Sequence, residues 1–183
     1  MLLTDEQPVV LITGISAAGK STVADLLARR FERGVHVKGD VFRRMVVAGR
    51  HEMTASPSEE ALRQLRLRFR LAAGTADAYH EAGFSVVVQD VIIGPPLAEV
   101  ITTIRSRPLV VVVLAPSADV VAQRESHRTK NAYAHGIDGL LRLDRALRGD
   151  TPRIGLWIDT SDQLPSQTVE EIITRGIDEG AIG

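Results

Sequence analysis

The sequence contains no cysteine, which excludes disulfide bonds and thiolate-held metal ions. Aromatic residues make up only 4% of its 183 residues, and the formal net charge is −1, so no overall field attracts nucleic acid or an anionic membrane. Lysine is rare too, occurring only as Lys20, Lys38 and Lys130. No apolar run approaches the length of a membrane span, and residues 1–8 lack the basic and apolar regions of a signal peptide. We therefore expect a cytoplasmic protein with neither nucleic-acid nor membrane partners.

Residues 14–21 have the sequence Gly-Ile-Ser-Ala-Ala-Gly-Lys-Ser, which fits the phosphate-binding pattern G-x-x-x-x-G-K-[ST] of P-loop proteins. A β-branched apolar run precedes the motif and a helix-forming segment follows it, as this loop requires. Glycine lets the backbone fold closely around a phosphate, and the start of a helix adds free N–H groups. We expect Lys20 to reach the β- and γ-phosphates and Ser21 to hold Mg²⁺. The residues expected to bind the nucleotide are Gly14, Ser16, Ala17, Ala18, Gly19, Lys20, Ser21 and Thr22.

Apolar runs typical of strands alternate with helical segments along the chain. This alternation predicts a three-layer α/β fold, a P-loop NTPase domain spanning 1–183, in which helices cover both faces of a five-stranded parallel sheet. The expected strands are 9–13, 35–38, 84–89, 109–114 and 154–159. The expected helices are 22–30, 41–48, 57–82, 95–106, 118–128 and 168–177, with 131–149 partly helical. Ligands of such folds bind beyond the carboxyl ends of the strands, where the P-loop, Asp40 and Asp90 all fall.

Two acidic residues follow predicted strands at this edge. Asp40 follows the second strand, where a kinase needs a base to take the proton of an attacking hydroxyl. The alternative is that Asp40 only caps the helix beginning at Val41. Arg43, one helical turn further on, is a candidate ligand for an anionic or hydroxylated acceptor. Asp90 ends the apolar run 86–88 in a Walker-B-like pattern, so we expect it to help bind Mg²⁺, directly or through water.

Arginines after the fourth strand suggest a lid. Arg124 and Arg128 lie four residues apart, on one face of a predicted helix. Small kinases carry a lid here, whose guanidinium groups offset the charge of the transferring phosphate. We expect a lid at about 124–149, with Lys130 assisting; the alternative is an ordinary charged helix face. Most arginines of the long helix are expected to face solvent, and the histidines show no metal-ligand spacing.

Together these motifs resemble the small P-loop kinases, most closely the chloramphenicol phosphotransferase-like group, with gluconate, shikimate and adenylylsulfate kinases more distant. The resemblance implies that Asp40 is the base for an acceptor hydroxyl and that Arg124 and Arg128 lie over the nucleotide. The antibiotic-modifying member has a further lid arginine, whereas this chain has Thr-Lys-Asn at 129–131. The resemblance therefore implies a small-molecule kinase without implying chloramphenicol as its substrate. The matching segments are 14–21, Gly39-Asp40, 86–91 with Gly94, Arg124-Glu125 with Arg128, and 156–160.

The sequence thus predicts an enzyme that moves the γ-phosphoryl group of Mg·ATP to a hydroxyl of a small molecule. Lys20, Asp40, Arg124 and Arg128 are the expected catalytic residues, and Asp40 with Arg43 the expected acceptor contacts. One alternative is a nucleoside or nucleotide kinase, and another is a nucleotide-dependent switch without transfer. No N-K-x-D sequence supports a GTPase, and 183 residues leave little room for the second helical domain of an AAA-type motor. The identity of the acceptor, the oligomeric state and the choice between ATP and GTP stay open.

Overall fold

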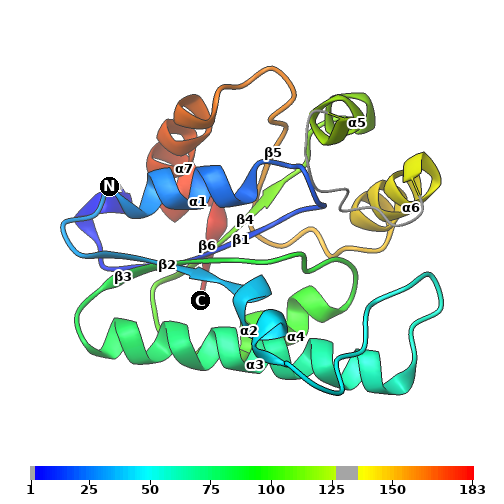
Figure 1. The fold of residues 1–183 in the computed structure, drawn as a ribbon. Coiled ribbons are helices and arrows are strands. Elements are labelled where there is room, and N and C mark those ends of the chain that lie inside the picture. The colour runs from blue at the N-terminus through cyan, green and yellow to red at the C-terminus, as the bar shows by residue number, and fades with distance from the viewer. Residues whose placement is uncertain (1–2, 127–135) are drawn as a thin grey trace.

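A parallel sheet lies at the centre of the computed structural model, which describes residues 3–126 and 136–183 (Figure 1). Five strands run parallel in the order β2-β3-β1-β4-β5. A two-residue strand near the chain end, β6 (Ala181–Ile182), pairs antiparallel with β4 and was not predicted. The predicted three-layer α/β fold is confirmed. The parallel strands are β1 (Val9–Thr13), β2 (Gly34–Lys38), β3 (Ser85–Gln89), β4 (Leu109–Leu114) and β5 (Leu156–Ile158).

Helices cover both faces of this sheet. Figure 1 shows α1 (Lys20–Ala28) and α7 (Pro165–Gly180) on one face, and α3 (Glu59–Glu81) and α4 (Pro96–Thr103) on the other. The short helix α2 (Gly39–Met45) packs against α3, and α5 (Ala118–Ser126) packs against α6 (Gly136–Gly149). A 3-10 turn, η1 (Leu3–Asp5), contacts α7. Within the described ranges, no helix combines the length and the apolar character needed to cross a membrane.

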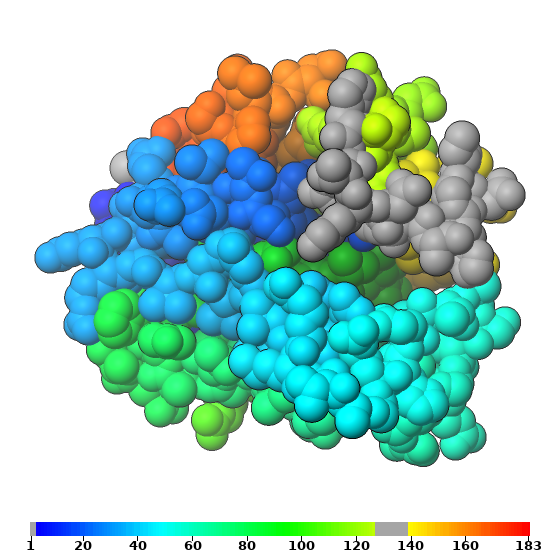
Figure 2. Space-filling view, in the orientation of Figure 1, coloured from blue at the N-terminus to red at the C-terminus, as the bar shows by residue number. Residues whose placement is uncertain are grey.

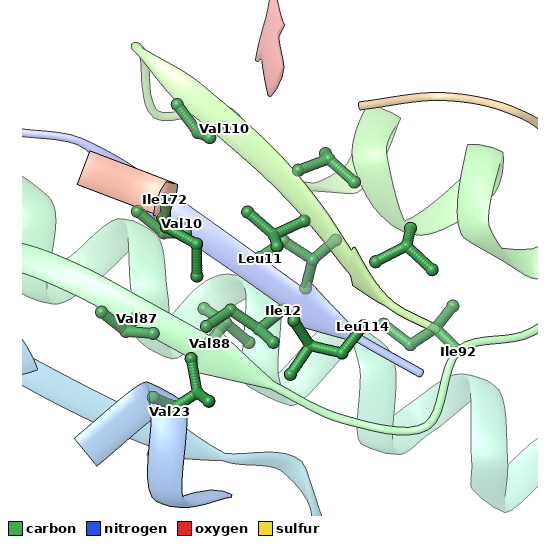
Figure 3. Close-up of a cluster of buried hydrophobic side chains, with 14 of the residues drawn as sticks. Val10, Leu11, Ile12, Val23, Val87, Val88, Ile92, Val110, Leu114 and Ile172 are labelled. Atoms are coloured by element: carbon green, nitrogen blue, oxygen red, sulfur yellow. The ribbon is translucent and has the colours of Figure 1, made fainter. Parts of the chain in front are cut away.

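The central strands β1 and β4 form the core, and every one of their side chains is buried. A central strand with helices on both faces has no side that meets water, which explains why 9–12 and 109–114 are continuously apolar rather than alternating. Figure 3 shows side chains of these strands meeting Val87 and Val88 of β3, Val23 of α1 and Ile172 of α7. This rigid core fixes the strand ends that carry the candidate site.

The first residue of the long helix α3 differs from the expectation. The helix begins at Glu59 because Ser58, rather than Ser56, is its N-cap: the Oγ of Ser58 accepts a hydrogen bond from the N–H of Ala61 (3.2 Å). Two serines two residues apart present the same capping chemistry, so the pattern alone did not distinguish them. The bounds of the other predicted strands and helices that fall on described residues lie within three residues of those observed, and α6 covers residues 136–149 of the segment predicted as partly helical.

Candidate active site

The P-loop connects β1 to α1 at the carboxyl edge of the sheet. Positive φ angles occur at Gly14 (142°), Ala17 (61°) and Gly19 (92°). Glycine adopts such angles without a steric penalty, whereas Ala17 is the one non-glycine residue with positive φ in the described part of the chain. Backbone strain of this kind gathers at ligand-binding sites. Helix α1 begins directly after Gly19, so its free N–H groups face the loop.

Lys20 is the first residue of α1, and its side chain is almost fully buried. Its Nζ donates a hydrogen bond to the backbone carbonyl of Ile15 (2.8 Å), inside the loop. A phosphate oxygen can take the place of this carbonyl, and its negative charge makes the hydrogen bond from the lysine ammonium stronger. Ser21 and Thr22 follow on the exposed start of the helix. The side chains expected to bind phosphate and Mg²⁺ therefore lie together at one helix N-terminus.

Asp40 lies in the first turn of α2, two residues after the end of β2. Its carboxylate accepts a hydrogen bond from Arg43 Nε (2.8 Å) and pairs with Arg44 Nε (3.1 Å). The helix begins at Gly39 with Lys38 as its N-cap, so the alternative in which Asp40 caps the helix is wrong. Burial raises the pKa of Asp40, but the hydrogen bond from Arg43 and the nearby arginine charges outweigh this and hold the pKa below its ordinary value. The carboxylate is therefore ionised at neutral pH, as a general base must be.

Arg43 is held between two carboxylates. Its Nε donates to Asp40, and its Nη1 donates to both carboxylate oxygens of Glu52 at 2.8 Å. The hydrogen bond to Asp40 is the main cause that raises the pKa of Arg43. Its charge is thus offset by the protein before any acceptor binds. To contact an anionic acceptor as expected, Arg43 has to release Glu52 and bind the acceptor in its place.

Asp90 directly follows β3 and is 4% exposed. Arg68 of α3 spans its carboxylate, with Nε donating to Oδ2 (2.7 Å) and Nη2 to Oδ1, while the N–H of Val91 also donates to Oδ1 (2.7 Å). Burial raises the pKa of Asp90, and the Arg68 charge and these hydrogen bonds oppose the rise. Arg68 therefore faces inward, the exception among arginines of which most were expected to face solvent. The other arginines of the helix, Arg63, Arg66 and Arg70, are exposed.

The position of Asp90 is fixed from two further directions. Thr13 at the end of β1 donates its hydroxyl to the carbonyl of Ile92 (2.8 Å) and accepts from the N–H of Ile92 (2.9 Å). These reciprocal bonds hold the segment after β3 against β1. On the other side, Gly39 packs so closely against the Asp90 carboxylate that a Cβ there would clash with it. The start of α2, which carries Asp40, is thereby tied to Asp90.

A cavity of about 1290 Å³ connects these groups. The P-loop, Asp40, Arg43, Arg68 and Asp90 all line it, so the structure brings most of the predicted site residues together. Figure 2 shows it as a recess between the blue N-terminal part and the cyan segment 46–58, with green atoms at its floor. The volume exceeds that of an ordinary single-ligand pocket. Beyond Asp40 the lining is largely apolar, with Phe42, Val46, Met53, Leu65, Phe69, Leu71, Ile93, Pro96 and Leu143.

The predicted lid is only partly described. Arg124 on α5 is half-buried and donates Nη2 to the backbone carbonyl of Thr160 (2.9 Å), just after β5. It does not line the cavity. Arg128 and Lys130 lie outside the described residues. Residues 136–149 of the predicted lid form α6, which contributes part of the cavity wall through Gly139, Arg142 and Leu143.

A Mg²⁺ ion would find few protein ligands here. In the described segments, no three acidic or histidine side chains cluster as a metal site. Mg²⁺ bound with a nucleotide needs only one or two protein ligands, since phosphate oxygens and water supply the rest. The Ser21 hydroxyl and the Asp90 carboxylate are the candidates for these ligands, and both residues line the same cavity. Both oxygens of Asp90, however, are engaged by Arg68.

The strand order, the helices on both faces and the loop before α1 define a three-layer P-loop kinase-like fold. The family model described as an AAA domain matches residues 9–141, from β1 into α6. The chain therefore belongs to this AAA domain family. No curated protein matches the sequence.

Solved structures of similar fold include several kinases. A sugar kinase from Janibacter sp. HTCC2649 is 23% identical, with a TM-score of 0.67 over 95% of this chain and 96% of the other. The adenylylsulfate (APS) kinase of Mycobacterium tuberculosis, solved with AMPPNP and APS, is 18% identical, with a TM-score of 0.68 over 91% and 95%. The tunicamycin resistance protein of Deinococcus radiodurans is 18% identical, with a TM-score of 0.66 over 97% and 99%. At these identities the likeness is one of fold.

Proposed function

We propose that this protein is a small-molecule kinase that transfers the γ-phosphoryl group of Mg·ATP to a hydroxyl group. The observation that carries the proposal is one cavity that contains both the P-loop lysine and the ionised carboxylate of Asp40. Phosphoryl transfer needs a phosphate-binding loop and a base for the attacking hydroxyl within reach of one another. The sugar and APS kinases of similar fold support the same class of reaction.

Each residue has a defined task in this proposal. Lys20 exchanges the Ile15 carbonyl for phosphate oxygens, and the backbone N–H groups of the loop bind the same anion. Asp40 accepts the proton of the acceptor hydroxyl, because its pKa is held below its ordinary value and it is ionised before the acceptor binds. Mg²⁺, held by Ser21 and Asp90, would offset charge on the phosphates. Arg124 and Arg128 remain the proposed lid arginines.

The acceptor half of the cavity favours a hydroxylated molecule with a neutral, partly apolar body. Its walls are mainly apolar, and the arginines that line it beside Asp40 already pair with protein carboxylates. An anion bound at Arg68 would have to break a buried pair, which costs free energy, and an anion bound at Arg43 would have to displace Glu52. The nucleotide-kinase alternative predicts an anion or base site near Arg43 and the arginines of the long helix. An anion site there has less support, because Arg43 pairs with Glu52 and Arg68 with Asp90. The resemblance to the chloramphenicol phosphotransferase-like group stays a prediction.

ADP release from Mg·ATP across a panel of acceptors tests the proposal. The panel contains hydroxylated natural products, sugars, sugar acids, nucleosides and nucleotides, each assayed with wild type, Asp40→Asn and Asp25→Asn. Asp25 is a matched control, since it is a half-exposed aspartate on α1 outside the cavity lining. We expect one acceptor class to stimulate turnover, and Asp40→Asn alone to lower it by about a hundredfold or more. Equal stimulation of wild type and Asp40→Asn would refute the assignment of the base, and bound nucleotide without transfer to any acceptor would support the switch instead.

A further inference from the structure

The Asp90 carboxylate has little free capacity to bind a metal ion. Oδ1 accepts hydrogen bonds from Arg68 Nη2 and from the N–H of Val91, which use both of its lone pairs. Oδ2 accepts from Arg68 Nε, and its remaining side lies against Gly39. The side chain is also almost completely removed from solvent. The residue best placed by sequence to bind Mg²⁺ is therefore already neutralised by a guanidinium.

Arg68 is equally confined. Its side chain is 13% exposed, and its planar guanidinium makes two parallel hydrogen bonds to a carboxylate, the arrangement in which arginine binds most strongly. It also lines the cavity, and its charge contributes to lowering the pKa of Asp40. Arg68 thus lies among the groups that, under the proposed function, surround the transferring phosphoryl group.

From this geometry we propose that Arg68 and Mg²⁺ compete for Asp90, so that binding of Mg·nucleotide displaces Arg68 from this carboxylate. The inference rests on the proposed function for the presence of Mg²⁺. Oδ1 has no lone pair left and the free side of Oδ2 is blocked by Gly39, so direct coordination of a metal ion by Asp90 requires Arg68 to leave the carboxylate. Displacement frees the Arg68 guanidinium inside the cavity beside Asp40, where negative charge of the phosphates and acceptor gathers. Arg68 is then a positioning residue, which occupies the Asp90 carboxylate until Mg·nucleotide binds.

The affinity for AMPPNP, measured by calorimetry in Mg²⁺ and in EDTA at pH 8, tests the competition without any acceptor or turnover. The dissociation constant in EDTA divided by the dissociation constant in Mg²⁺ is a ratio that reports how much the metal strengthens binding. In Arg68→Gln no pair has to be broken, so we expect Mg²⁺ to strengthen AMPPNP binding at least about fivefold more than it does in wild type. Arg66→Gln, an exposed arginine on the same helix, is the matched control and should leave the ratio unchanged.

Two further variants separate the competition from a general charge effect and from misfolding. Arg68→Lys keeps the charge but cannot hold both oxygens, so it should raise the ratio by a smaller factor than Arg68→Gln. In an Asp90→Asn background, Arg68→Gln should no longer raise the ratio. A gain that persists without the Asp90 carboxylate, or a ratio that stays unchanged or falls in both Arg68 variants, would overturn the proposal. Failure of the proposed function appears separately, as nucleotide binding without phosphoryl transfer in the acceptor panel.

Discussion

Acid should weaken this fold through His36, a residue of β2, the strand that leads to Asp40. The ring is 8% exposed, and neither ring nitrogen has a hydrogen-bond partner among the described residues. The nearest carboxylate oxygen, Oδ1 of Asp25, is 3.9 Å away. Burial is the main cause that lowers the pKa of His36 from 6.5 to about 4, and the charge of Lys38 adds to it. The folded protein therefore keeps this histidine neutral at pH values where the unfolded chain protonates it.

The sign and size of the effect follow from linkage. A histidine with a depressed pKa in the folded state contributes stability that is fully present above pH 6.5 and is lost as the pH falls toward 4. The full effect amounts to about 3 kcal/mol, and about 2 kcal/mol of it is lost between pH 7.5 and pH 5. For a domain of this length, 2 kcal/mol lowers the melting temperature by about 4–8 °C.

Urea unfolding at pH 7.5 and pH 5, for wild type and His36→Leu, measures this contribution. Removing the buried imidazole should reduce the loss of stability between the two pH values by about 2 kcal/mol relative to wild type. His51→Leu is the matched control, because it removes an exposed histidine instead of a buried one. Identical pH dependence in wild type and His36→Leu would show that burial of His36 does not make the fold sensitive to acid.

Two predictions concern the packing at Gly39 and the segment that leads into β4. Gly39→Ala places a methyl group against the Asp90 carboxylate and should lower the free energy of unfolding in urea by about 1–3 kcal/mol. Gly74→Ala on α3 is the control, because a Cβ there meets nothing within 4 Å; it should raise the free energy of unfolding by about 0.5–1 kcal/mol. Equal effects of the two changes would contradict the packing at Gly39. Asp77→Ala leaves the backbone N–H groups of residues 105–106 without their carboxylate, and should lower the melting temperature by about 6–12 °C; a loss below 2 °C would show that water replaces it.

The fold could be predicted well because its signals are local and strong. The run 109–114 has six consecutive apolar residues and forms a central strand with the predicted bounds. The two-residue strand β6 is too short to show a hydrophobic pattern, and its pairing with β4 depends on where α7 ends. Such pairing is a tertiary effect that a sequence pattern does not contain.

The candidate site was predictable where a motif fixes both the residue and its place. Lys20 and Ser21 lie at the helix N-terminus as the P-loop pattern requires, and Asp40 and Asp90 follow their strands. Arg68 was missed because an arginine on a charged helix normally faces water. One signal was available: Arg68 lies three residues after Leu65 and four before Ala72, on the face that packs inward. Its partner Asp90 is 22 residues away in the sequence, so no local sequence pattern indicates the pair.

Transfer of a radiolabelled γ-phosphoryl group from ATP to the stimulating acceptor shows directly whether Asp40 activates an acceptor hydroxyl. We expect wild type to form a labelled phosphate ester of the acceptor, one for each ADP released. We expect Asp40→Asn to form the ester about a hundredfold more slowly or worse, while its affinity for AMPPNP is unchanged. Label found only in inorganic phosphate, or an ester formed equally fast by Asp40→Asn, would contradict the claim that Asp40 activates an acceptor hydroxyl in this cavity.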